Sequence, residues 1–123
     1  MPNKLANIMG SGYPGQAANY ISGIAADSLV ATGSTQATAL LITADSNAVI
    51  TTAASTGVVF PTNTSPGDEM FVKNYGANAL SIYPALGESI DAIATNGAYS
   101  LATTKSAYFV KTSATRWASL LSA

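Results

Sequence analysis

The side chains that could do acid–base chemistry in this sequence are carboxylates, because the chain contains no histidine and no cysteine. Among its six acidic residues, Glu88 and Asp91 are the pair whose spacing suits joint catalysis. Two carboxylates roughly 5 to 9 Å apart across a cleft can hydrolyse a glycosidic bond. Glu88 and Asp91, however, flank a turn in a small chain with no evident groove. Since charged side chains are mostly exposed, we expect both in a solvated loop, and we do not expect an enzyme.

The missing residue types also exclude whole classes of site. The commonest zinc sites, histidine-assisted nucleophiles and disulfides each lose a required side chain. Residues 44–47 (ADSN) are too short for a calcium loop. Residues 10–15 (GSGYPG) match the letters of the dinucleotide-binding fingerprint, but no suitable strand precedes them and Pro14 occupies a position in the phosphate cradle. The sequence therefore predicts no catalytic, metal-binding or cofactor-binding residues.

Charge is sparse and balanced along the chain. Charged residues make up 9% of the sequence and the net charge is −1, whereas ordinary soluble domains are about 25% charged. The five basic residues never cluster: they are Lys4, Lys73, Lys105, Lys111 and Arg116. A basic patch for nucleic acid is therefore not expected. A surface this neutral is either covered with small hydroxyl and amide groups or buried against other subunits, and both fit a particle component.

Apolar runs are short throughout the sequence. None approaches the roughly 20 residues needed to span a bilayer, so we expect no membrane partner. The first residues, MPNKLANIMGSGYPG, also lack the continuous apolar core of a signal peptide. We therefore expect synthesis and folding in the cytoplasm.

Residues 1–27 are predicted to be an N-terminal arm outside the main domain. Three glycines and a proline between positions 10 and 15 prevent a regular element there, so an extended conformation is expected. Residues 16–27 place four apolar side chains on one helical face, but Gly23 weakens a helix by roughly 1 kcal/mol relative to alanine. Either a short helix or an irregular segment fits these residues.

Residues 28–123 are predicted to be a single β-domain. Short stretches rich in Thr, Val and Ile recur at spacings of about 8 to 12 residues with turn residues between them, which indicates eight to ten strands. Alternation is clearest in residues 57–90, where Met70 and Val72 share one face of a strand. Residues 37–42 (ATALLI) fit a buried strand or a helical turn. We predict an all-β fold, namely an antiparallel β-sandwich that is jelly-roll-like in the loose sense.

The large aromatic side chains are divided between core and rim. Residues 107–111 and 116–120 are predicted to form a closing hairpin with Trp117 in the core, because an aromatic of this size buries about 150 to 250 Å². Four tyrosines are expected to be half-buried sheet residues with their hydroxyls at the rim: Tyr75, Tyr83, Tyr99 and Tyr108. A sugar-binding platform would need two or three of them on one exposed face, which alternation does not settle.

A succession of motifs after residue 57 covers about half of the chain, and it includes VxxP, VxNxGANAL, IYPxxG and a late tryptophan. The residues concerned are Val58, Pro61, Gly67, Asp68, Val72, Asn74, Gly76, Ala77, Asn78, Ala79, Leu80, Ile82, Tyr83, Pro84, Gly87, Ile90, Ala107, Phe109, Val110 and Trp117. In these residues the chain resembles small accessory structural proteins of tailed-phage virions. The usual task in that family is capsid decoration, also called cementing.

The resemblance implies a function and its partners. It implies a decoration (cement) protein on the outer capsid surface of the virion, bound to the major capsid protein at junctions between its subunits and forming a homotrimer. Similar domains also occur on fibres, so a fibre or spike-tip module that binds host surface glycans is the alternative. The side chains expected to contact the partner are the apolar ones of the arm, which are Leu5, Ile8, Met9, Tyr13, Tyr20 and Ile21.

Overall fold

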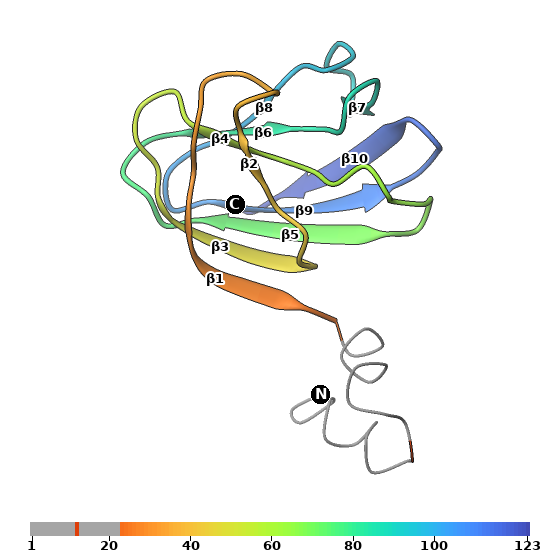
Figure 1. Cartoon of the computed structure of the whole chain (residues 1–123), viewed down its shortest axis with the longest axis horizontal. Helices are drawn as coiled ribbons and strands as arrows, with labels where there is room; N and C mark the ends of the chain where they lie inside the picture. The colour runs from red at the N-terminus through yellow and green to blue at the C-terminus, as the bar shows by residue number, and fades with distance from the viewer. Residues whose placement is uncertain (1–11, 13–22) are drawn as a thin grey trace.

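A computed structural model of the 123-residue chain describes residue 12 and residues 23–123, and this part of the chain is all-β (Figure 1). Its strands are β1 (Ala25–Val30), β2 (Leu40–Leu41), β3 (Ser46–Thr51), β4 (Gly57–Val59), β5 (Glu69–Asn74), β6 (Leu80–Tyr83), β7 (Ser89–Ile90), β8 (Tyr99–Leu101), β9 (Ser106–Lys111) and β10 (Arg116–Leu121). Most of the candidate helix at residues 16–27 lies outside the described residues. Its last three residues belong to β1, so the expected domain boundary after residue 27 falls inside a strand.

From β1 to β6 the chain alternates between two sheets. The six-stranded sheet has the order β1-β3-β5-β9-β10-β7, and the four-stranded sheet has the order β2-β4-β6-β8. Each of the first four strands therefore pairs with the next strand but one, and all four of these pairs are parallel. Ser46 of β3, for example, pairs with Phe71 of β5. This part of the chain is a flattened parallel solenoid of three coils.

The all-β class is confirmed, but the predicted antiparallel, jelly-roll-like connectivity is wrong. Turn residues between short strands fit a hairpin and a corner leading to the opposite sheet equally well. A chain that changes sheet at every corner returns in the same direction after two strands, so it pairs parallel. Among the described strands, antiparallel ladders join β6 to β8, β5 to β9 and β9 to β10. The last of these ladders is the predicted closing hairpin.

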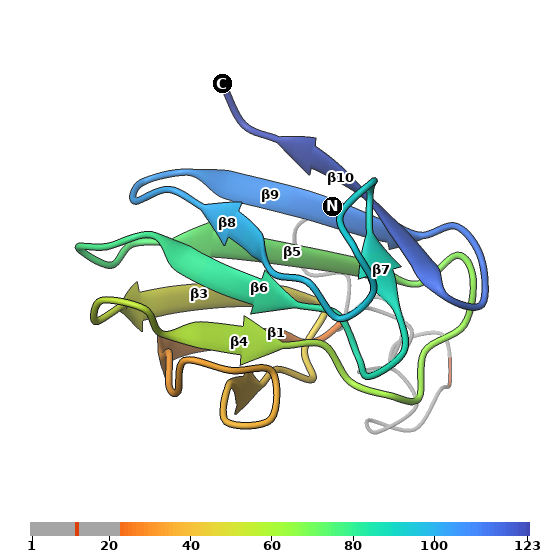
Figure 2. The ribbon, with the colours of Figure 1, turned by 90° about the horizontal axis from the view of Figure 1, so that it is seen from above.

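The core lies between the two sheets, which face each other as two layers (Figures 1 and 2). Its fully buried side chains include Val49, Val72 and Phe109 from one sheet and Val58, Leu80, Ile82 and Leu101 from the other. Trp117 is 0% exposed, as predicted. The Phe60 ring lies between Phe109 and Trp117, with ring centroids 5.2 and 4.8 Å away. Alternate residues of each strand are left for the two outer faces.

The buried side-chain amide of Asn74 stabilises the corner that follows β5. The Nδ2 atom of Asn74 donates to the carbonyl oxygens of Asn78 and Leu101 at 2.9 and 3.1 Å. Its Oδ1 atom accepts from the Thr52 hydroxyl and the Gly76 N–H, both at 2.9 Å. A Cβ atom at Gly76 would lie 2.5 Å from the Cβ of Thr52, so a larger residue would push the two corners apart. These contacts hold successive coils in register.

Candidate binding surfaces

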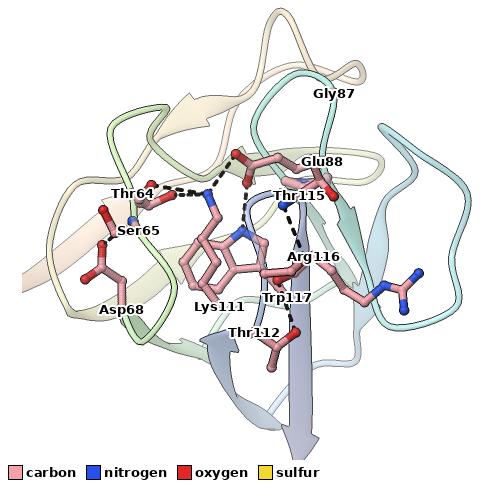
Figure 3. Close-up of polar contacts among 12 residues, drawn as sticks. Thr64, Ser65, Asp68, Gly87, Glu88, Lys111, Thr112, Thr115, Arg116 and Trp117 are labelled. Atoms are coloured by element: carbon pink, nitrogen blue, oxygen red, sulfur yellow. Dashed lines mark hydrogen bonds and ion pairs between the residues drawn. The ribbon is translucent and has the colours of Figure 1, made fainter.

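Glu88 and Lys111 form a buried ion pair at the ends of β7 and β9 (Figure 3). The Nζ atom of Lys111 lies 3.0 Å from Oε2 of Glu88, and the two side chains are 2% and 11% exposed. The other carboxylate oxygen accepts from the indole N–H of Trp117 at 2.9 Å. Lys111 also donates to the hydroxyl of Thr64 at 2.8 Å and to its carbonyl oxygen. One cluster thus joins β9, β10, the start of β7 and the loop before β5.

The expectation of a solvated loop is wrong for Glu88, although Asp91 is exposed. Asp91 accepts hydrogen bonds from the backbone N–H and the hydroxyl of Ser119. Both carboxylate oxygens of Glu88 are engaged inside the protein by Lys111 and Trp117. The two carboxylates therefore have separate structural partners, and the cluster around Glu88 stabilises the fold.

An apolar hollow of about 260 Å³ opens on the side of the four-stranded sheet. Its lining includes the apolar side chains of Leu41, Val59, Phe60 and Leu86, and no charged residue is among the described residues that line it. Leu86 is 79% exposed and Leu41 is 57% exposed. We call this surface the Leu86 hollow. Two large leucines exposed side by side form a surface suited to burial against another protein.

Side-chain hydrogen bonds hold the loops that frame the Leu86 hollow. The Nε2 atom of Gln36 donates to the carbonyl oxygen of Pro84 at 2.8 Å and to Oδ1 of Asn96 at 3.2 Å. The Tyr83 hydroxyl donates to the carbonyl oxygen of Ser34 at 3.1 Å. The loop that follows β1 and the loop that follows β6 are therefore tied together. A partner that covers the hollow would not have to order them, which lowers the entropic cost of binding.

The outer face of the six-stranded sheet carries exposed aromatic side chains. Phe71 and Tyr75 alternate with buried residues of β5, so they point away from the core, and they are 38% and 63% exposed. Lys73 lies between them, with Nζ 5.4 Å from the centroid of the Tyr75 ring. Tyr108 on β9 is the cross-strand partner of Phe71, and Leu120 on β10 is the partner of Tyr108. We call these five residues the aromatic face.

Two hollows flank Phe71 on the aromatic face. The larger one, of about 500 Å³, extends toward β1 and β3 and includes Asp27, Lys73 and Tyr75 in its lining. The smaller one, of about 280 Å³, extends toward β9 and β10. The prediction of a half-buried tyrosine is confirmed for Tyr83, Tyr99 and Tyr108 but is wrong for Tyr75, because Tyr75 follows the last residue of β5 and projects into solvent. Exposed aromatic rings and polar groups thus meet on one surface.

One tyrosine of the aromatic face has a perturbed pKa. The Glu69 carboxylate accepts a hydrogen bond from the Tyr108 hydroxyl, and its negative charge opposes ionisation of the phenol. Together with some desolvation, this raises the pKa of Tyr108 above its ordinary value of 10.0. Tyr108 therefore stays neutral, with its hydroxyl directed to Glu69, throughout the physiological pH range.

Other expectations concern residues and sites that the structure describes only in part. The predicted partner-binding side chains of the arm all lie outside the described residues: Leu5, Ile8, Met9, Tyr13, Tyr20 and Ile21. Within residues 23–123, no group of three or more acidic side chains is placed so that it could hold a metal ion. The same part of the chain has no helix with the length and apolar character needed to cross a membrane.

Comparisons with protein-family models, curated proteins and solved structures find no match to this chain. The resemblance to phage decoration proteins therefore depends on the sequence motifs after residue 57. The fold and its surfaces define the chain more broadly, as an all-β protein whose coiled sheets carry two chemically different outer faces.

Proposed function

We propose that this chain is a decoration protein of a tailed-phage head, bound to the outer surface of the major capsid protein at junctions between subunits. The observation that carries the proposal is the Leu86 hollow, an uncharged apolar surface with exposed leucines. The sequence motifs that resemble decoration proteins support the same function. The glycan-binding fibre module remains the competing function for the whole chain.

The hollow is suited to a protein partner by its chemistry. Burying one leucine side chain contributes about 1.5 to 3 kcal/mol. Because Leu86 is 79% exposed, most of this free energy would be gained only when a partner covers it. The described residues of the lining carry no charge, so burying them requires no desolvation of an ion. The hydrogen-bonded loops keep the leucines in place before the partner arrives. An apolar projection of a capsid subunit is the occupant that we propose.

The proposed assembly is a homotrimer at each junction. Homo-oligomers with closed symmetry are the usual arrangement for soluble subunits, and a chain with 9% charged residues has large neutral surfaces available for burial. Light scattering of the purified protein and native mass measurement of isolated particles test this part. A monomer at high concentration, combined with isolated copies on the particle, would contradict it.

Binding to heads tests the attachment surface directly. Heads assembled from the major capsid protein alone are mixed with the purified chain and sedimented. Leu86→Asp places a charge in the apolar hollow and is expected to weaken co-sedimentation by roughly tenfold or more. The matched control is Leu120→Asp, because Leu120 is 70% exposed on the other sheet. The control should bind as the unmodified chain does.

Location on the virion separates decoration from the fibre alternative. Electron microscopy of virions that contain a labelled chain should show copies over the whole head. Label confined to one vertex or to appendages would overturn the proposal in favour of a fibre or spike component. Absence of head binding by the unmodified chain would overturn it as well.

A further inference from the structure

The 500 Å³ hollow on the aromatic face has a mixed chemical lining. Phe71 and Tyr75 provide exposed aromatic rings, while Asp27 and Lys73 are the two charged residues among those described in the lining. Hydroxyl groups come from Ser46 and Ser106, and they lie among the small alanines of β1 and β3. The volume is within the range of about 300 to 1,000 Å³ that is typical of small-ligand sites.

Strand register explains why a hollow forms at this place. Phe71 pairs with Ser46 on β3, and Lys73 pairs with Ala48 on β3 and Ser106 on β9. Small side chains thus occupy the neighbouring positions on β3, and on β9 beside Lys73, whereas Tyr108 is the β9 neighbour of Phe71. Because side chains stand roughly perpendicular to a sheet, the Phe71 ring and Lys73 rise above a floor of small residues. The hollow follows from this alternation of large and small residues.

We propose that this hollow binds a saccharide of two or three pyranose rings. The C–H face of a pyranose is apolar and packs on an aromatic ring, while its hydroxyl groups need donors and acceptors around the rim. Phe71 and Tyr75 supply the rings. The Asp27 carboxylate accepts hydrogen bonds, and the Lys73 ammonium donates them, as well as contacting the Tyr75 ring and the Thr104 carbonyl oxygen. A few convergent polar groups around an aromatic surface are what fixes a small ligand in one orientation.

The polar groups favour a saccharide over the other ligands that aromatic rings attract. Single-stranded nucleic acid also stacks on aromatic side chains, but it requires several cations along its backbone. Lys73 is the one cation among the described residues that line this hollow, and Asp27 opposes a phosphate. An uncharged surface such as the Leu86 hollow is better suited to binding a protein. The saccharide is the ligand that uses both the rings and the two charged groups.

The saccharide site does not depend on the proposed attachment to capsids. The aromatic face belongs to the six-stranded sheet, whereas the Leu86 hollow lies on the side of the four-stranded sheet. A chain attached through the Leu86 hollow would keep the aromatic face free. Each site can therefore be disabled without the other.

Saturation-transfer NMR with defined probes tests the proposal on the full chain. The probes are maltotriose, cellotriose, triacetylchitotriose and purified O-polysaccharide, and an oligothymidylate serves as the nucleic-acid comparison. Irradiation of the aromatic protons should transfer saturation to the ring protons of at least one saccharide. Tyr75→Ala should weaken its binding by about tenfold, whereas Tyr75→Phe, which keeps the ring, should bind within about threefold of the unmodified chain. Because Tyr75 is 63% exposed, both variants are expected to fold.

The outcomes separate this proposal from the proposed function. Saccharide binding that is lost in Tyr75→Ala but kept in Leu86→Asp supports the site, whether or not the chain binds heads. The proposal is overturned if no saccharide gives a signal at millimolar concentration, or if Tyr75→Ala and Phe71→Ala both bind as the unmodified chain does. Saturation of the oligothymidylate alone would also overturn it, in favour of a nucleic-acid surface.

Discussion

Replacing Glu88 with glutamine should strongly destabilise the protein. Glutamine keeps the size of the side chain and can still accept the indole N–H of Trp117 through its carbonyl oxygen. It removes the negative charge 3.0 Å from Nζ of Lys111, whose side chain is only 2% exposed. The ammonium group would then be buried without a counter-charge, with Thr64 as its remaining hydrogen-bond partner.

The size of the effect follows from the burial of the pair. Breaking a buried ion pair by removing one partner costs about 3 to 5 kcal/mol, out of a total unfolding free energy of about 5 to 15 kcal/mol for a typical domain. For a chain of this length the melting temperature should fall by roughly 10 to 20 °C. Lys111→Met should also destabilise, since it leaves the carboxylate of Glu88 buried and unpaired. The double variant should recover much of the loss, because it leaves neither charge buried without a counter-charge.

Chemical denaturation and thermal melting, followed through the fluorescence of Trp117, measure both single variants and the double variant. The four free energies give the coupling between Glu88 and Lys111 as a double-mutant cycle. A matched control is Asp91→Asn, which changes an exposed carboxylate at the other end of β7. If Glu88→Gln costs no more than Asp91→Asn, or if the coupling is near zero, the ion pair does not hold this end of the protein together.

Three further predictions concern the corners and the aromatic face. Asn74→Ala should cost about 2 to 4 kcal/mol of unfolding free energy, because it removes four side-chain hydrogen bonds, three of them buried, and urea denaturation measures this. Gly76→Ala should cost about 1 to 3 kcal/mol through its contact with Thr52. Adding Thr52→Ser should restore little, since serine keeps the side-chain oxygen, the Cβ and the backbone N that the new methyl group would meet. Glu69→Gln should lower the pKa of Tyr108 toward 10, which titration of phenolate absorbance measures. A raised folded-state pKa stabilises the protein below pH 10 and loses that contribution as the pH rises above it, so Glu69→Gln should reduce the loss of stability in strong alkali.

Strand positions could be predicted from local pattern, but strand pairing could not. Met70 and Val72 alternate with exposed residues in the sequence, and they are buried in β5. The pairing of Gly57 with Ser81, by contrast, depends on two coils approaching closely. A Cβ atom at Gly57 would lie 2.5 Å from the carbonyl oxygen of Ser81, so glycine permits the parallel contact between β4 and β6. An isolated glycine at the start of a strand gives no sign of which strand lies beside it.

The buried ion pair explains why residue type alone gave a wrong prediction for the exposure of Glu88. Glu88 and Lys111 lie 23 positions apart, and charged side chains are seldom buried, so nothing local marks them as partners. Their burial requires that three groups, the carboxylate, the ammonium and the Trp117 indole, meet at one point. With these two charges inside, at most nine of the eleven charged side chains remain for the surface. The outside of the protein is therefore even more neutral than its composition indicates, which strengthens the physical case for burial of the Leu86 hollow against another subunit.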